Sequence, residues 1–180
     1  MALTVLLAVP VWAAELPINT RLGGDFELSS TKAGIDGVGD FRGKVVLLNF
    51  GYTHCPDICP MVLNRMAVVM KELGKQRPDV VPAFVTFDPK RDTLDRLGQY
   101  LNYFGDDFIG FTGSEDQLAA VAKKYGVIAI PSQSDSAAGI LYSHSDYVYL
   151  LDQKGRVRAL YSKSDSIDKI VDGVESLLDD

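Results

Sequence analysis

The sequence predicts one α/β domain, in which a strand–helix–strand unit is followed by a β-hairpin and a terminal helix. The chain has 180 residues, of which 47% are hydrophobic, so it is long enough to bury a substantial core. Apolar runs of strand length at 45–50 and 80–87 alternate with segments of helical period, the pattern of a helix-covered sheet. Two further apolar runs, 146–152 and 157–161, flank a short turn and indicate the hairpin.

The first fourteen residues differ from the rest because they are uncharged and almost entirely apolar. This run is shorter than the roughly 20 residues that a membrane-spanning helix requires, and Val11–Ala13 resembles a small-x-small cleavage pattern. We interpret residues 1–14 as a signal-like segment or a truncated membrane anchor, with a buried N-terminal strand or helix as the alternative. The predicted domain therefore comprises residues 15–180 of an exported protein.

The first half of the domain contains the strand–helix–strand unit. Residues 25–28 alternate between polar and apolar side chains, which favours a short strand. The run at 45–50 is apolar on both faces, as expected for a strand at the centre of the sheet. Apolar side chains then recur with helical period from about 60 to 73, and Gly74 ends that helix.

The second half of the domain continues the sheet and adds the terminal helix. Asp92 and Thr93 are residues that commonly cap a helix, so a helix is expected to start there. The remaining predicted elements are a strand at 80–87, a helix at 93–103, a strand at 108–111, a helix from 114–116 to 125–126, a surface loop at 130–141, the hairpin strands at 146–152 and 157–161, and a final helix at 167–178.

The charge of the chain excludes one class of partner. Its 24 acidic and 18 basic residues give a formal net charge of -6, and the basic residues form no dense cluster in the sequence. Nucleic-acid binding requires such a cluster to neutralise phosphates, so we expect no nucleic-acid partner. The acidic balance is interpreted as a solubility feature.

Both cysteines of the chain, Cys55 and Cys59, lie where the strand at 45–50 gives way to a helical pattern. On an ideal helix this spacing separates the Cβ atoms by about 5–6 Å, whereas a disulfide requires roughly 3.5–4.5 Å. Two thiolates on one metal ion, with metal–sulfur bonds of about 2.3 Å, accept a slightly wider separation. The spacing favours metal chelation, but thiol–disulfide chemistry stays open because Pro56 and Pro60 break the ideal geometry.

The position of the prolines sets the expected state of the sulfurs. If the helix begins at Pro60, Cys59 occupies its N-cap and Cys55 precedes it in the loop. Both sulfurs then face the positive end of the helix dipole, which favours thiolates and lowers their pKa. Such thiolates serve metal binding and redox exchange alike. A purely structural disulfide is the weaker alternative, because the loop that it would close is short.

A late histidine, His144, is the candidate third ligand. It lies just before the strand at 146–152, and if that strand pairs with the strand before the cysteines, His144 comes close to their loop. Two thiolates and an imidazole form a three-coordinate set that copper accepts in both oxidation states, whereas closed zinc sites have four protein ligands. His54 is a weaker candidate that we expect to point away from the sulfurs. Asp88 is expected either beside the site as an acceptor or in turn and cap contacts.

These residues together resemble the Sco/SenC family of copper-handling proteins. The resemblance is carried by the Cys-Pro-x-x-Cys-Pro element within 51–60, by residues 87–93 and by His144 before an apolar strand. It covers about residues 20–178, although family members often carry Val-Asp before the histidine, where this chain has Tyr142 and Ser143.

The resemblance implies a thioredoxin-like fold, with a central mixed β-sheet flanked by helices. It implies that Cys55, Cys59 and His144 bind copper, as Cu(I) or Cu(II), in a metallochaperone that loads or prepares the dinuclear copper site of cytochrome c oxidase. The implied partners are the copper-accepting subunit of that oxidase, other periplasmic copper chaperones and thiol reductants. The implied location is the periplasm, or the outer face of the inner membrane through an N-terminal anchor.

The competing hypothesis is an enzyme. In this alternative Cys55 and Cys59 are the catalytic, redox-active pair of a thiol-disulfide oxidoreductase, in which one cysteine attacks and the other resolves. Some family members look more like reductases of this kind, acting on cysteines of the oxidase copper site. The two hypotheses differ in His144, because a Cu(II) site needs the imidazole and simple dithiol exchange does not.

Overall fold

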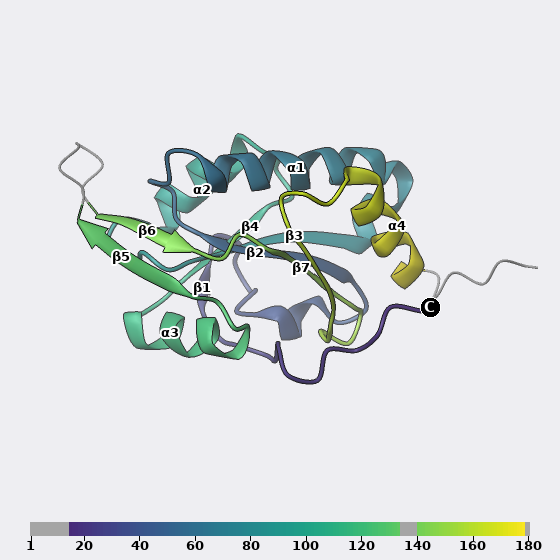
Figure 1. Cartoon of the computed structure of the whole chain (residues 1–180), viewed down its shortest axis with the longest axis horizontal. Helices are drawn as coiled ribbons and strands as arrows, with labels where there is room; N and C mark the ends of the chain where they lie inside the picture. Colours follow the sequence, from purple (N-terminus) through teal and green to yellow (C-terminus); the bar gives the residue numbers. More distant parts are fainter. Residues whose placement is uncertain (1–14, 134–139, 179–180) are drawn as a thin grey trace, which may run out of the picture.

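The computed structural model describes residues 15–133 and 140–178, which form a mixed β-sheet with helices on both faces (Figure 1). The strands are β1 (Ser29–Ser30), β2 (Val45–Gly51), β3 (Val80–Thr86), β4 (Ile109–Thr112), β5 (Ala129–Gln133), β6 (Ile140–His144), β7 (Val148–Leu151) and β8 (Val157–Tyr161). The helices are α1 (Ile58–Glu72), α2 (Leu94–Asn102), α3 (Glu115–Lys124) and α4 (Ile167–Leu178), with short 3-10 segments at Val38–Phe41 and Gly74–Asp79.

The central sheet has the strand order β1-β4-β3-β2-β7-β8, and β5 and β6 form a separate two-stranded sheet. β2, β3 and β4 run parallel, whereas β1, β7 and β8 pair antiparallel with their neighbours. All seven residues of β2 are buried, which confirms that this apolar run is a central strand. The sequence-predicted α/β domain with its C-terminal hairpin is therefore present.

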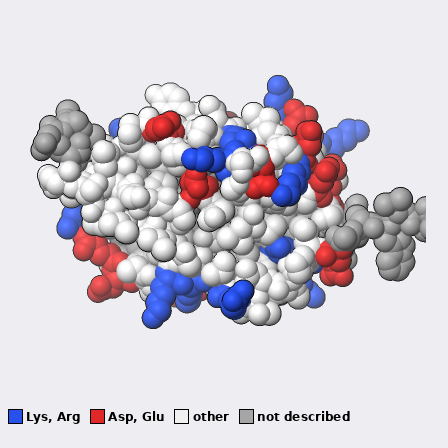
Figure 2. Space-filling model, viewed as in Figure 1, with Lys and Arg blue, Asp and Glu red and all other residues white. Residues whose placement is uncertain are grey.

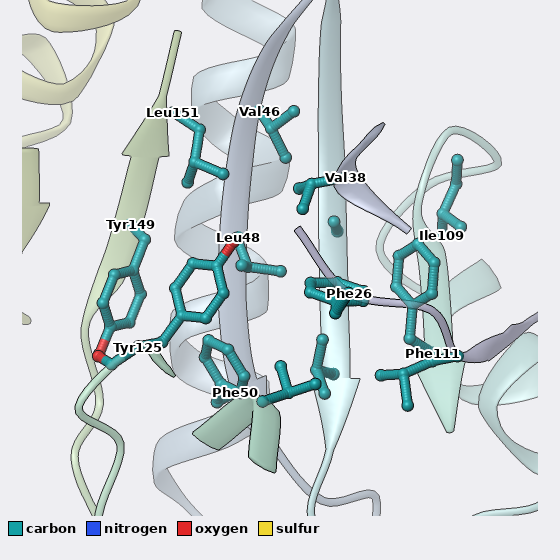
Figure 3. Packing of buried hydrophobic residues seen from close by; sticks show 14 of the residues in the cluster. Phe26, Val38, Val46, Leu48, Phe50, Ile109, Phe111, Tyr125, Tyr149 and Leu151 are labelled. Atoms are coloured by element: carbon teal, nitrogen blue, oxygen red, sulfur yellow. The ribbon is translucent and has the colours of Figure 1, made fainter. Parts of the chain in front are cut away.

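The two faces of the sheet bury two apolar clusters. Alternate residues of β2 enter each cluster, Val45 and Leu47 on the face covered by α1, α2 and α4, and Val46, Leu48 and Phe50 on the face covered by α3. Figure 3 shows the second cluster, in which the side chains of β2 pack with aromatic rings from other segments. Side chains of β2 thus pack into the core on both faces of the sheet. This packing fixes the position of the residues at the end of the strand.

Most predicted elements are confirmed to within two residues. Two helix caps also form as their sequences indicate. Thr93 Oγ1 accepts from Arg96 N at 3.2 Å, and Ser114 forms a capping box with Gln117. The confirmed elements are β2, β3, β4, β7, β8, α1, α2, α3 and α4.

The strand expected at 25–28 is wrong. These residues are outside the sheet, and the Leu28 N–H donates to the Asp36 carbonyl at 2.7 Å instead of to a neighbouring strand. The alternation arose because Phe26 and Leu28 are buried against the core while Asp25 and Glu27 are exposed. The edge strand is instead the two-residue β1, which pairs with β4.

The prediction of a surface loop at 130–141 is wrong at both ends of that range, where the structure has strands. Residues 129–133 form β5 and residues 140–144 form β6, which pair antiparallel, while 134–139 lie outside the described residues. Every side chain of the two strands is at least partly exposed, so the segment lacks the alternation of buried and exposed residues by which a strand is recognised. The predicted segment 1–14 also lies outside the described residues.

On the face of the molecule that Figure 2 shows, charged side chains of both signs gather toward the upper right and along the lower edge, and a broad uncharged area lies between them. Ion pairs among the described residues include Arg77 with Asp107 and Lys90 with Glu115. Among the residues that the structure describes, no helix is both long enough and apolar enough to cross a membrane.

Candidate metal centre

The candidate site lies at the end of β2 and is assembled from two separate segments. The loop of residues 52–57 follows β2, carries Cys55 and leads into α1, whose first turn contains Cys59. β7 pairs with β2 so that Val148 lies beside Asn49, which places the start of β7 at the same end of the sheet. His144, the last residue of β6, therefore comes next to the cysteine loop, as the sequence predicted for this pairing.

The helix start differs from the prediction in a way that matters for the sulfurs. α1 begins at Ile58 after an N-cap at Asp57, so Cys59 is inside the first turn and not at the cap. Pro60 is the third helical residue, where its missing N–H is one of the donors that lack an intrahelical partner anyway. The Cys59 N–H instead donates to Cys55 Sγ at 3.4 Å, so the first cysteine sits at the helix N-terminus.

The structure brings the three predicted ligands together. Cys59 Sγ lies 3.5 Å from His144 Nε2, and the potential ligand atoms of Cys55, Cys59 and His144 all lie within 4.8 Å of one another. Both cysteines are free thiols, Cys55 half-buried and Cys59 buried. His144 Nδ1 is 2.9 Å from the Ser145 carbonyl, which can only accept, so Nδ1 carries the proton and Nε2 faces the sulfurs.

The two sulfurs are electrostatically unequal. Their mutual hydrogen bond lowers the pKa of Cys55 and raises the pKa of Cys59, because the single shared proton stays on the more buried sulfur. Burial of the His144 ring acts to lower its pKa, but hydrogen bonds with Cys55 and with the Ser145 carbonyl outweigh burial and raise it. The more accessible sulfur therefore has the thiolate character that a nucleophile or a metal ligand requires.

A buried carboxylate holds the start of the cysteine loop. Asp92 is 0% exposed and accepts three hydrogen bonds, from Thr53 N at 2.9 Å, Thr53 Oγ1 at 2.6 Å and Thr86 Oγ1 at 2.6 Å. The sequence suggested only that Asp92 caps α2, and this role at the loop was missed. In the sequence, Asp92 is visible only as a carboxylate one residue before the cap Thr93. That position does not reveal its hydrogen bonds with Thr53.

The two weaker candidates lie beside the site. His54 Nδ1 is 3.1 Å from Thr53 Oγ1 and 3.7 Å from Asp92 Oδ1, and it does not belong to the group formed by the cysteines and His144. Asp88 forms an ion pair with Arg91, and its own N–H donates to Thr86 Oγ1 at 3.0 Å. His54, Asp88 and Asp92 have potential ligand atoms within 4.8 Å of one another, but those of Asp92 already accept hydrogen bonds from the two threonines.

Comparison with known proteins places this donor set in a family. The family model described as SCO1/SenC matches residues 15–179, which is nearly all of the chain. The chain belongs to the SCO1/SenC family. The expected thioredoxin-like fold, a mixed sheet flanked by helices, is that of the Sco structures that it matches and is confirmed.

Curated SCO relatives come from bacteria and from mitochondria. The SCO2-like protein of Rickettsia felis is 40% identical over 139 residues, which are 77% of this chain and 68% of that protein. The mitochondrial SCO2 homolog of Bos taurus is 38% identical over 153 residues, which are 84% of this chain but only 58% of the bovine protein. The bovine relative thus includes a substantial part that this chain does not match.

Solved Sco structures match most of the chain. Arabidopsis thaliana ScoI with copper bound is 32% identical with a TM-score of 0.80, and the match covers 88% of this chain and 99% of that one. Yeast Sco1 with copper bound is 32% identical with a TM-score of 0.76, and the match covers 86% of this chain and 89% of that one. Both of these neighbours were solved with the metal that the sequence resemblance implied.

Proposed function

We propose that this chain is a copper metallochaperone, which binds one copper ion through Cys55, Cys59 and His144 and delivers it to the dinuclear copper site of cytochrome c oxidase. The observation that carries the proposal is the proximity of two thiol sulfurs and an imidazole Nε2, all within 4.8 Å. The copper-bound Sco neighbours support the choice of metal. Soft thiolates suit Cu(I), and the imidazole adds a donor that suits Cu(II).

The unequal exposure of the ligands suggests the order of transfer. Cys55 is half-buried and Cys59 is buried, so an incoming thiolate of the acceptor reaches the copper ion on the side of Cys55. The copper–Cys55 bond breaks as the copper–acceptor bond forms, with no change of oxidation state. Cys59 and His144 hold the ion until a second acceptor ligand replaces them. The acceptor in this proposal is the copper-accepting subunit of the oxidase.

The test of the proposal compares the two histidines of the chain. Wild-type reduced protein is titrated with Cu(I) under anaerobic conditions and with Cu(II), and the thiolate-to-Cu(II) charge-transfer absorption is recorded. We expect one copper ion per chain, with Cu(II) binding strongly impaired in His144→Ala and unchanged in His54→Ala, the matched control. Wild-type protein that binds neither ion in a one-to-one ratio would overturn the proposal.

A second function, thiol-disulfide exchange, is favoured by the asymmetry of the cysteine pair. The Cys55 thiolate attacks a disulfide of the target and releases one target thiolate, and Cys59 then attacks Cys55 to release the other. The target gains two electrons and the chain becomes a Cys55–Cys59 disulfide. This function predicts a reduction potential between about -270 and -120 mV and turnover that persists in His144→Ala.

The proposed setting is the periplasm or the outer face of the inner membrane, with other copper chaperones or thiol reductants as further partners. It rests on the uncharged apolar run at 1–14 and on the family resemblance. Fractionation of cells that produce the full chain, with protease added to the intact outer surface, tests this placement. We expect the domain to be found outside the inner membrane.

A further inference from the structure

The third candidate ligand is carried by a hairpin that is not part of the central sheet. His144 ends β6, which pairs only with β5 in a separate two-stranded sheet, and the two strands project from the body of the domain (Figure 1). Most of their side chains are partly or fully exposed. Packing of the core therefore fixes the cysteines far more firmly than it fixes the strand that carries His144.

A buried tyrosine of the cysteine loop reaches across to this strand. Tyr52 is 1% exposed, and its hydroxyl oxygen accepts a hydrogen bond from the backbone N–H of Tyr142 at 3.2 Å. Its ring lies 5.4 Å from Phe87, 5.1 Å from Tyr142 and 6.0 Å from His144, measured between ring centroids. One side chain thus joins the loop before Cys55 to the residue two positions before His144.

An arginine makes a second link to the same strand. Arg91 Nη2 donates to the Ile140 carbonyl at 2.7 Å, and its guanidinium carbon lies 5.8 Å from the centroid of the Tyr52 ring, within cation–π range. The same guanidinium pairs with Asp88, whose side chain is 5% exposed. Arg91 therefore connects a buried carboxylate at the end of β3 with the first residue of β6.

We propose that Tyr52 and Arg91 are positioning residues that hold β6, and with it His144, against the cysteine pair. The inference rests on the proposed copper site and adds residues that no ligand set includes. We call Tyr52, Asp88 and Arg91 the hairpin clamp. Its backbone contacts reach Ile140 and Tyr142, the first and third residues of β6, so the strand is held along the length that leads to His144.

The clamp acts selectively on one oxidation state of the bound ion. Two thiolates on the rigid β2–α1 junction suffice for Cu(I), which accepts low coordination with sulfur ligands. Cu(II) requires the imidazole as well, so its retention depends on how firmly β6 is held. Loosening the clamp therefore weakens Cu(II) binding and leaves Cu(I) binding unchanged.

The test removes each clamp contact separately. Tyr52→Phe deletes the hydroxyl and keeps the ring, and Arg91→Gln deletes the guanidinium. We expect Cu(II) to dissociate about three- to tenfold faster, the equivalent of one lost hydrogen bond. The charge-transfer spectrum should shift toward that of His144→Ala. Because the Tyr52 hydroxyl also interacts with Cys55, Cu(I) binding is compared in Arg91→Gln, whose Cu(I) affinity measured by competition should stay within about twofold of wild type.

Two matched variants separate positioning from general destabilisation. Tyr149→Phe removes another buried hydroxyl, which donates to the Tyr125 carbonyl at 2.9 Å within the apolar cluster under α3 and is not part of the clamp. Arg77→Gln removes an arginine that pairs with Asp107 at the surface. Both are expected to release Cu(II) at the wild-type rate, even where they lower the free energy of unfolding.

A metal-free measurement keeps this inference separate from the proposed function. Amide hydrogen exchange at Tyr142, followed by NMR in reduced protein without copper, should be faster in Tyr52→Phe and unchanged in Tyr149→Phe. The clamp proposal would be overturned if the Tyr142 amide of Tyr52→Phe exchanged at the wild-type rate. It would also be overturned if both clamp variants released Cu(II) at the wild-type rate. Failure of the wild-type chain to bind copper would overturn the proposed function, while the exchange rates would still decide whether the clamp holds β6.

Discussion

At the scale of single residues, the absence of one side chain makes room for the candidate site. A Cβ atom at Gly51 would lie 2.7 Å from Cys59 Sγ and 2.9 Å from Phe84 Cε2, both closer than van der Waals contact allows. Gly51 is the last residue of β2, directly before the loop that carries Cys55. The glycine at this point is therefore required by the sulfur and not by a turn.

Gly51→Ala should displace the Cys59 sulfur and disturb both stability and copper binding. We expect a loss of about 1–3 kcal/mol in the free energy of unfolding, the usual cost of overpacking a core. Cu(II) affinity should fall as well, because Cys59 Sγ would move relative to His144 Nε2. Urea unfolding and Cu(II) competition titrations measure the two effects. Wild-type values for both would contradict the close contact.

Asp92 gives a second prediction at this scale. Asp92→Asn keeps the size of the side chain but replaces one acceptor oxygen by a donor amide, so at least one bond from Thr53 or Thr86 is lost. We expect a destabilisation of about 2–3 kcal/mol, because a buried donor is left unpaired. Urea unfolding measures it, and Asp95→Asn on the exposed face of α2 is the control. Equal stability of the two variants would show that the carboxylate is dispensable.

The sequence could identify the candidate ligands but not the residues that hold them. Cys55, Cys59 and His144 carry chemistry that is recognisable from residue type and spacing. Tyr52 and Asp92 act through contacts with residues 90 and 39 positions away in the chain, at Tyr142 and Thr53. No local pattern encodes such partners, because they are brought together only by the pairing of strands and the packing of loops.

At the scale of elements, two helices contain a glycine in opposite surroundings. In α2, a Cβ atom at Gly98 would meet only Thr31 Cγ2, at 4.0 Å, which is ordinary contact. In α4, a Cβ atom at Gly173 would lie 1.9 Å from the Tyr161 hydroxyl, so the helix packs on β8 only because the side chain is missing. Glycine thus lowers the stability of α2, where a side chain would fit at Gly98, and is needed in α4, where a side chain at Gly173 would not fit.

The two alanine substitutions should change stability in opposite directions. Gly98→Ala is expected to raise the free energy of unfolding by up to about 1 kcal/mol, because alanine has the higher helix propensity. Gly173→Ala is expected to lower it by about 1–3 kcal/mol, because α4 must move away from β8. Thermal and urea unfolding of the pair measures both. Stabilisation by Gly173→Ala would mean that α4 is not packed as described.

Helices and strands could be predicted from the sequence where the pattern of apolar residues matched the burial of their side chains in the structure. β2 is buried on both faces, and α4 presents one apolar face to the sheet, so each has the pattern expected for its type. Two segments failed for the opposite reason. β5 is exposed along most of its length and resembles a loop, whereas residues 25–28 alternate in burial without forming a ladder.

At the scale of the whole molecule, a buried arginine links the N-terminal segment to the C-terminal half of the sheet. Arg158 on β8 is buried, and it bonds to Asp152 Oδ2 at 3.2 Å and to the Leu16 carbonyl at 2.7 Å. Asp152 Oδ1 also accepts from the backbone N–H of Lys154 at 3.0 Å and of Arg156 at 2.9 Å, within the β7–β8 turn. Asp152 therefore organises the hairpin turn and pairs with Arg158, which in turn bonds to the first described residues.

This carboxylate should make part of the stability depend on pH. Burial acts to raise the pKa of Asp152, but hydrogen bonds from Arg156, Arg158 and the turn outweigh burial and lower it. A pKa that is lower in the folded state contributes stability that is complete above the unfolded value of about 3.9. The contribution is then lost as the pH falls through the lower folded value.

Asp152→Asn tests this dependence. At pH 7 we expect a loss of about 3 kcal/mol in the free energy of unfolding, because the variant leaves the buried Arg158 opposite a neutral side chain. The difference from wild type should begin to narrow below about pH 4, where Asp152 of the unfolded wild-type chain binds a proton, and should narrow further as the pH falls through the lower folded value, where the folded carboxyl also becomes neutral. Urea unfolding in steps from pH 7 to acid measures it, with the exposed Asp106→Asn as control. A difference that stays constant with pH would show that the lost stability comes from side-chain shape and hydrogen-bond geometry, and not from the charge of Asp152.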